Sequence, residues 1–204
     1  MTTIDAKTVM NLRQMTGAPM MDCKAALIET GGDMDKAKDV LRKKGMASAA
    51  KASSREVKEG KLFSYVHHTG KVAVVVEIVC ETDFVAMNEE FNAFGNNVCL
   101  TVAAFSPEYV DREGVDPAAI EKERQFVLEQ TMETMKGKPQ EVVDKAVDGR
   151  MRKFFEDKCL TEKSYVNKAD QSDSRSVEQV RQELVGKIGE NIVIRRFHRM
   201  ELGG

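Results

Sequence analysis

Hydrophobic positions divide the 204-residue chain into a helical first quarter and a longer part that mixes strand and helix patterns. Over residues 5–45, short apolar stripes at helical spacing are separated by Thr16-Gly17 and by Gly31-Gly32, which are typical helix ends. The expected amino-terminal caps are Asp5, Asp22 and Asp33. With Gly45 ending the third helix, the pattern predicts a compact three-helix domain over residues 1–45.

Two adjacent methionines, Met20 and Met21, lie between the first two of these helices. A domain of this size has little apolar surface of its own to bury, so it is weakly stable unless the remaining apolar groups find a partner. Methionine side chains suit such a contact surface, but they also fill gaps in cores. The spacing alone leaves both interpretations open.

Residues 46–60, MASAAKASSREVKEG, contain hardly any large apolar side chain. Such a segment has little to bury. Its lysines alternate with glutamates and no aromatic residue accompanies them, which favours a solvated, partly helical linker over an RNA contact. We therefore place a linker here, between the three-helix domain and a core of residues 61–204.

The core begins with two strand patterns, residues 61–68 and 71–80, joined at Thr69-Gly70 in a way typical of a β-hairpin. The second strand, VAVVVEIVC, is apolar at nearly every position, which predicts cover on both faces. Residues 191–200 have the character of a final strand that rejoins this sheet. The predicted fold class is α+β, a small antiparallel sheet covered by helices.

Helix signals fill the rest of the core. One helix is expected over residues 88–106, and Asp116-Pro117 begins the next with a capping carboxylate and a proline at the first helical position. Gly137-Lys138-Pro139 separates that helix from a third. Ser176 and Gln179 have the spacing of a capping box and predict the start of a fourth.

A charged and aromatic pair, Asp83 and Phe84, lies where the second strand leads into the helix over residues 88–106. Strand-to-helix corners are exposed and rigidly held, so a carboxylate beside a phenyl ring there suits insertion into a partner. In the alternative interpretation, Asp83 caps a turn and Phe84 closes the core beneath it. The sequence leaves both interpretations open: the corner favours an exposed ring, whereas large aromatic side chains are more often buried.

Charge and cysteine usage restrict the class of partner. The chain has 31 basic and 33 acidic residues, a net charge of −2 and an isoelectric point near 6.0, which argue against direct nucleic-acid binding. Four cysteines occur singly, which suggests neither a zinc site nor disulfides and fits a reducing compartment. No apolar stretch is long enough to span a bilayer. We expect a cytoplasmic protein with no membrane association and no cofactor.

Signatures of catalysis are missing from the sequence. It has no phosphate-binding GxxxxGKS loop, no GxGxxG after a strand, no GxSxG elbow and no HExxH. Adjacent acids such as Glu89 and Glu90 at a helix start are more often partners of the helix dipole than catalysts. His67 and His68, beside the hairpin turn, have no third ligand nearby, which favours a contact role. We expect that the protein is not an enzyme.

Three segments together resemble the bacterial translation elongation factor Ts family. They are LRQMTGAPMMDCKAAL at 12–27, CETDFVA at 80–86, and IGENI at 188–192 followed by Arg196-Phe197. The match follows the family's order over essentially the whole chain. It implies a ubiquitin-associated-like domain at residues 1–45, the family's core domain after it, and guanine-nucleotide exchange on the GTPase elongation factor Tu, with no bond made or broken in the exchange step.

The resemblance also implies particular contact residues. The segment that matches the family's insertion near the magnesium ion of the GTPase is Thr82, Asp83, Phe84 and Val85, with Phe84 as the wedge. The matched contacts of the three-helix domain are Arg13, Met20 and Met21. The matched contacts of the core are His67, Ile188 and Gly189. The chain departs from the family at Pro19, where glycine is usual, and at Lys163-Ser164, where Gln-Pro is usual, which leaves the role of both loops open.

The core contains a single hairpin, which bears on the expected oligomeric state. Longer members of the family carry a duplicated core, and short members pair two chains to supply the second half. A sheet of about three strands is near the minimum for independent stability and exposes its outer strands, so we expect a homodimer. The alternative to nucleotide exchange is a non-catalytic protein-binding module with a structural dimer core.

Overall fold

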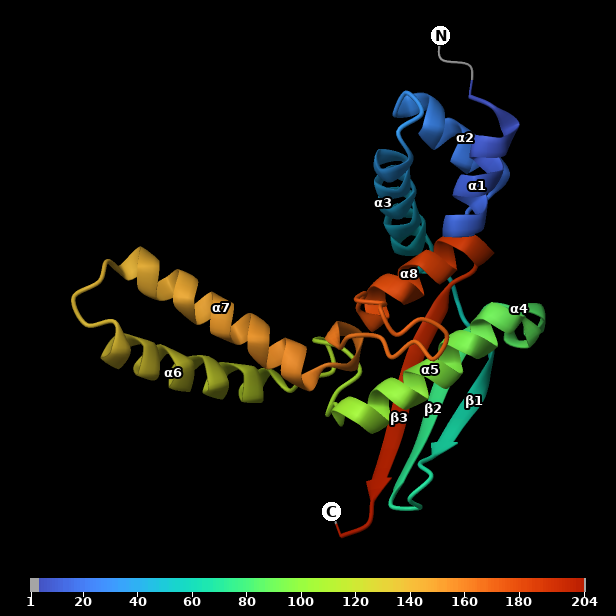
Figure 1. Ribbon diagram of the computed structural model, residues 1–204. Helices are drawn as coiled ribbons and strands as arrows, with labels where there is room; N and C mark the ends of the chain where they lie inside the picture. The colour runs from blue at the N-terminus through green and yellow to red at the C-terminus, as the bar shows by residue number, and fades with distance from the viewer. Residues whose placement is uncertain (1–3, 204) are drawn as a thin grey trace. The chain divides into compact units, whose positions relative to one another are not determined.

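The structure is a computed structural model that describes residues 4–203. It confirms the α+β class (Figure 1). The helices are α1 (Ala6–Thr16), α2 (Met20–Glu29), α3 (Met34–Ala52), α4 (Asp83–Met87), α5 (Glu89–Phe105), α6 (Pro117–Thr134), α7 (Gln140–Lys158), the short 3-10 helix η1 (Leu160–Glu162) and α8 (Val177–Ile188). The strands are β1 (Glu59–Val66), β2 (Val72–Cys80) and β3 (Ile192–Glu201).

The chain forms two compact units, each assembled from separate segments. The first combines the chain up to Leu62 with Glu77–Gly95 and Glu178–Ile194. The second combines Phe63–Val76 and Asn96–Val177 with the chain from Arg195 onward. The first unit therefore contains α1, α2, α3 and all of α8 but its first residue, together with the corner that follows β2.

The helices α1, α2 and α3 enclose a small apolar core and fit a ubiquitin-associated-like domain. Its buried members are Val9, Leu12, Cys23, Ala26, Leu27, Ala37 and Leu41. Two predicted caps are confirmed: the Asp5 carboxylate accepts from the backbone N–H of Thr8, and Asp33 caps α3 in the same way. The third was wrong, because α2 begins at Met20 after Pro19, which leaves Asp22 inside the first turn.

The prediction that the third helix ends at Gly45 was wrong, because α3 continues to Ala52. Gly45 lies where α3 crosses α8, because a Cβ added at Gly186 would come within 2.8 Å of the Gly45 Cα. The close approach therefore requires glycine at position 186, whereas a Cβ at Gly45 would meet only the carbonyl oxygen of Gln182, at 3.9 Å. Ala49 and Ala52, beyond Gly45 on the same helix, are buried. The first half of the predicted linker is therefore the last two turns of a packed helix.

The predicted hairpin and final strand are confirmed: β1, β2 and β3 form an antiparallel sheet in the order β1-β2-β3. Strand β1 starts two residues before the predicted position. The expectation that β2 is covered on both faces holds for its last three residues, which are all buried, but is wrong in the middle of the strand, where Val75 is 42% exposed. In the second unit, α5 lies along one face, where Cys99 meets the backbone of Val76 (Figure 1).

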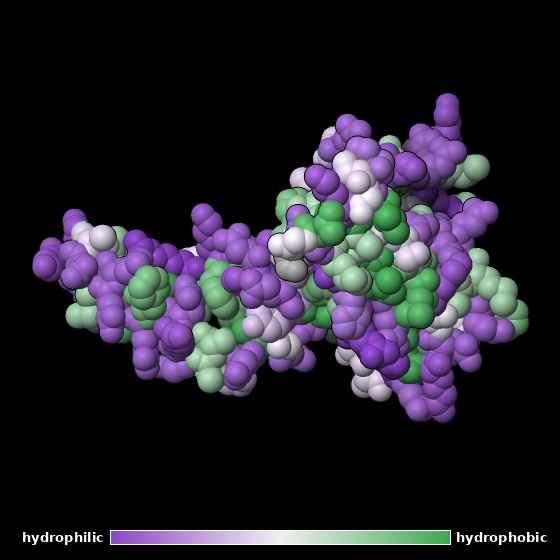
Figure 2. Space-filling view, turned by 90° about the horizontal axis from the view of Figure 1, so that it is seen from below, coloured by the Kyte–Doolittle hydropathy of each residue, from purple (hydrophilic) through white to green (hydrophobic). Residues whose placement is uncertain are grey.

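Helices α6 and α7 form an antiparallel hairpin around Val127, Val143, Val147 and Met151 (Figure 1). Asp116 caps α6 with Pro117 at the first position, as predicted. Figure 2 shows this hairpin at the left, its hydrophobic side chains separated by hydrophilic ones. Among residues 4–203, no helix is both long and apolar enough to cross a membrane.

Candidate partner-binding site

The corner after β2 presents Phe84 to solvent. Thr82 has extended backbone angles (φ −128°, ψ 156°) and turns the chain into the single-turn helix α4. Val85 on that helix is buried, whereas the Phe84 side chain is 81% exposed, the largest value among the exposed large hydrophobic residues of the described chain. Phe84 therefore does not close the core, and the alternative interpretation of this corner was wrong.

Asp83 is the first residue of α4 rather than its cap, and it is exposed beside Phe84. Met87, one turn further along, is also exposed, at 74%. Residues three apart on a helix lie on one face, so Phe84 and Met87 form a joint apolar surface next to a carboxylate. Met87 is not among the contact residues predicted from the sequence, although this spacing could have identified it.

The loop between α8 and β3 holds this corner in place. One oxygen of the Glu190 carboxylate accepts a hydrogen bond from the Thr82 hydroxyl at 2.7 Å, and the other accepts from the Thr82 backbone N–H at 3.0 Å. The Glu81 carboxylate accepts in return from the backbone N–H of Asn191 at 2.5 Å. Two predicted groups, Thr82–Val85 and Ile188-Gly189, are thus brought together.

A second layer of hydrogen bonds supports the same loop. The Arg55 guanidinium donates to the Glu81 carboxylate at 3.0 Å and to the carbonyl of Gly189 at 2.9 Å. The Asn191 side chain, in a residue only 2% exposed, donates to the carbonyl oxygens of Ser53 and Arg55. The corner therefore rests on a network of hydrogen bonds that is partly shielded from water.

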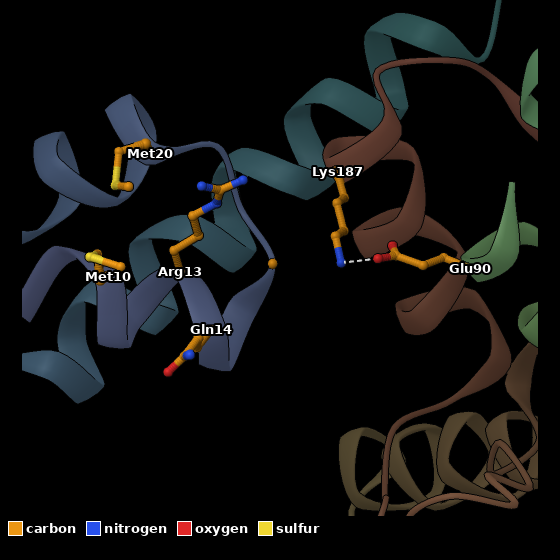
Figure 3. Close-up of a pocket in the computed structure, with 7 residues that line it drawn as sticks. Met10, Arg13, Gln14, Met20, Glu90 and Lys187 are labelled. Atoms are coloured by element: carbon orange, nitrogen blue, oxygen red, sulfur yellow. Dashed lines mark hydrogen bonds and ion pairs between the residues drawn. The ribbon is translucent and has the colours of Figure 1, made fainter.

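A cavity of about 330 Å³ adjoins α1 and α2. It is lined by Met10, Arg13, Gln14, Gly17, Met20, Glu90 and Lys187. In Figure 3, Met10, Arg13, Gln14 and Met20 lie on one side, and the ion pair between Lys187 and Glu90 lies on the other. Arg13 and Met20 were predicted from the sequence as contact residues. Glu90 and Lys187 could not be assigned to this site in that way, because they come from distant parts of the chain.

The two methionines at the start of α2 are surface residues. Met20 lines the cavity, and Met21 is more exposed still. Neither belongs to the buried core of the three helices. The structure therefore excludes the interpretation that they are core filler and leaves them available to a partner.

His67 belongs to the second unit, whereas the groups described so far belong to the first. Its Nδ1 is 2.8 Å from the Tyr65 hydroxyl, and its ring is 4.2 Å from that of the exposed His68. Its predicted role as a contact residue stays a prediction. Among residues 4–203, no three His, Cys, Asp or Glu side chains are placed to hold a metal ion.

The cysteines offer no reactive group to the surface. All four are buried and free. Burial raises the pKa of the Cys80 and Cys159 thiols to about 11 and that of Cys99 to about 12, so these three thiols are protonated near neutral pH. The exposed groups of the site are therefore carboxylates, cations, a phenyl ring and thioethers, which are suited to contact with a partner.

Comparison with known proteins gives matches across the whole chain. The family model described as Elongation factor TS matches residues 46–173. Elongation factor Ts of Thermoanaerobacter sp. (strain X514) is 47% identical over 200 residues, which cover 98% of this chain and 95% of that protein. Elongation factor Ts of Fervidobacterium nodosum is 46% identical over 98% of both chains, and that of Desulforamulus reducens is 46% identical over 100% of this chain and 91% of its own.

Proposed function

The chain belongs to the elongation factor Ts family and is a translation elongation factor, and on this basis we propose that it is a guanine-nucleotide exchange factor for the GTPase elongation factor Tu. It would bind the GTPase, promote release of GDP and leave when a new nucleotide binds. No covalent bond changes in this step, so the protein would act without being an enzyme.

The observation that carries the proposal is the exposed Phe84 beside Asp83, on a corner that hydrogen bonds hold in place. Full burial of such an apolar side chain in a partner contributes about 1.5–3 kcal/mol to binding. Because α4 presents the ring outward, this gain is made only in the complex. A wedge of this kind can convert binding energy into distortion of the partner's site.

The chemistry of a nucleotide site explains how the wedge would act. Magnesium bridges the nucleotide phosphates to the protein, so displacing its ligands removes a large part of the affinity for nucleotide. We propose that Thr82, Asp83, Phe84 and Val85 enter near this ion and disturb it. Linkage then requires that bound nucleotide weakens the binding of the exchange factor by the same ratio, which lets the complex dissociate after exchange.

A second surface would dock the GTPase. The cavity beside α1 and α2 places the cationic Arg13 next to the thioether of Met20, with the exposed Met21 nearby. An apolar anchor surrounded by polar groups is typical of a protein interface. We propose that this surface supplies affinity while the corner supplies release. Ile188, Gly189 and His67 would add core contacts.

The experiment is nucleotide release from the purified GTPase. Elongation factor Tu loaded with fluorescent GDP is mixed with excess unlabelled GDP, and the decay of fluorescence is followed with and without this protein. We expect the release rate to rise and to saturate with protein concentration. Binding without faster release would overturn the exchange function and support the alternative, a non-catalytic protein-binding module.

A further inference from the structure

Thr82 occupies the N-cap position of α4 but does not use its side chain as a cap. Threonine at this position ordinarily accepts a hydrogen bond from a backbone N–H of the helix it precedes. Here its hydroxyl donates to Glu190, a residue that follows 108 positions later, and its backbone N–H donates to the same carboxylate. The backbone and side chain of Thr82 are thus both fixed from outside the helix.

The helix that carries Phe84 is too short to orient itself. It has five residues, and among them only Val85 is buried. A single helical turn is not stable alone, because nucleation costs more than one turn of hydrogen bonds returns. The direction of the Phe84 ring therefore depends on how the two ends of α4 are held.

The two ends are held differently. At the carboxyl end, the Asn92 side chain of α5 donates to the carbonyl oxygen of Ala86 at 3.1 Å, and the Asn88 side chain accepts from the backbone N–H of Glu90. At the amino end, immediately before Asp83, the Glu190 carboxylate makes two charge-assisted hydrogen bonds to Thr82. Such bonds are stronger than neutral ones, and a bidentate pair also fixes orientation.

We propose that Glu190 is a positioning residue for nucleotide release, which orients the Asp83-Phe84 wedge through Thr82. This role rests on the proposed exchange function. Glu190 need not touch the GTPase, and its contribution is to keep α4 in the geometry that the insertion needs. Its loss should therefore affect the rate of release after docking more than docking itself.

The test compares Glu190→Ala with Glu190→Gln in the fluorescent GDP assay. The alanine variant loses both hydrogen bonds to Thr82, and we expect its maximal stimulated rate to fall about tenfold, equivalent to about 1.4 kcal/mol in activation free energy. The concentration that gives half of the maximal rate should change much less. In the glutamine variant the amide oxygen can accept from the Thr82 N–H and the amide nitrogen can donate to its hydroxyl oxygen, so most of the rate should return.

A double-mutant cycle with Phe84→Ala separates positioning from a general effect on folding. If Glu190 acts through the wedge, Glu190→Ala should slow release little further once the ring is absent. Amide hydrogen exchange of the free protein gives a second measurement, because the Thr82 N–H should exchange faster in Glu190→Ala and not in Glu190→Gln.

The outcomes are distinguishable. A wild-type protein that does not accelerate release would overturn the exchange function and the role of Glu190 with it. Acceleration by the wild type together with an unchanged Glu190→Ala variant, or with fully additive effects in the cycle, would overturn the inference alone.

Discussion

Phe84 differs in burial from two apolar residues that lie near it in the sequence. Its neighbour Val85 is buried beneath the corner, and Phe91, at the start of α5, is fully buried. The chain thus contains two nearby phenyl rings in opposite environments. A ring that makes few contacts in its own protein should contribute little to the stability of the fold.

We therefore predict that Phe84→Ala slows stimulated GDP release strongly but changes the free energy of unfolding by less than about 0.5 kcal/mol. The matched control is Phe91→Ala, which should cost about 3–5 kcal/mol because it leaves a cavity in the core. Stimulated release and urea denaturation measure the two effects. A Phe84→Ala variant as unstable as the control would place the ring in the core and contradict the wedge.

Two glycines inside helices, Gly186 in α8 and Gly149 in α7, have different roles in packing. Gly186 on α8 faces Gly45 on α3 at the crossing of the two helices, and a Cβ at Gly186 would lie 2.8 Å from the Gly45 Cα. Gly149, inside α7, has no atom within 4 Å of the position a Cβ would take. The first glycine permits close packing, whereas the second only weakens its helix, because glycine loses more backbone entropy on folding than alanine.

We predict opposite effects for the same substitution at these positions. Gly186→Ala should lower the free energy of unfolding by about 1–3 kcal/mol, since α3 and α8 must move apart. Gly149→Ala should raise it by about 0.5–1 kcal/mol. Thermal or urea denaturation of the two variants checks both signs. A neutral Gly186→Ala variant would mean that the crossing is loose.

The three-stranded sheet of the protein is small, and helices do not cover all of it. Within residues 4–203, the outer strands β1 and β3 each have β2 as their one neighbouring strand in the sheet. Val75 on β2 and Val66 on β1 point away from the buried side chains Val74 and Phe63 and are exposed. Exposed apolar side chains on an open sheet with two outer strands favour association.

We therefore predict that the free protein is a homodimer, since a twofold arrangement is the commonest way to cover such a surface. Light scattering at micromolar concentration should give about twice the chain mass of 22.8 kDa. Val75→Lys, which places a charge on the open face, should shift the mass toward the monomer, and Val142→Lys on the exposed surface of α7 is the matched control. A monomer mass that persists on concentration would contradict the prediction.

Local signals in the sequence determined much of the fold. The caps at Asp5, Asp33 and Asp116, the hairpin and the final strand were all predictable, because each depends on residues that are neighbours along the chain. The corner carrying Asp83 and Phe84 was also located from the strand pattern before it and the helix pattern after it. What remained open there was the direction of the ring.

Tertiary structure decided the features that depend on distant residues. Gly45 has the local character of a helix end, and only the approach of Gly186 shows that it lies inside a packed helix. The exposure of Val75 depends on how many layers cover the sheet, and the apolar sequence of β2 does not contain this information. Thr82 precedes α4 as a cap would, but its hydroxyl donates to Glu190, because folding brings this carboxylate from 108 positions away to within 2.7 Å.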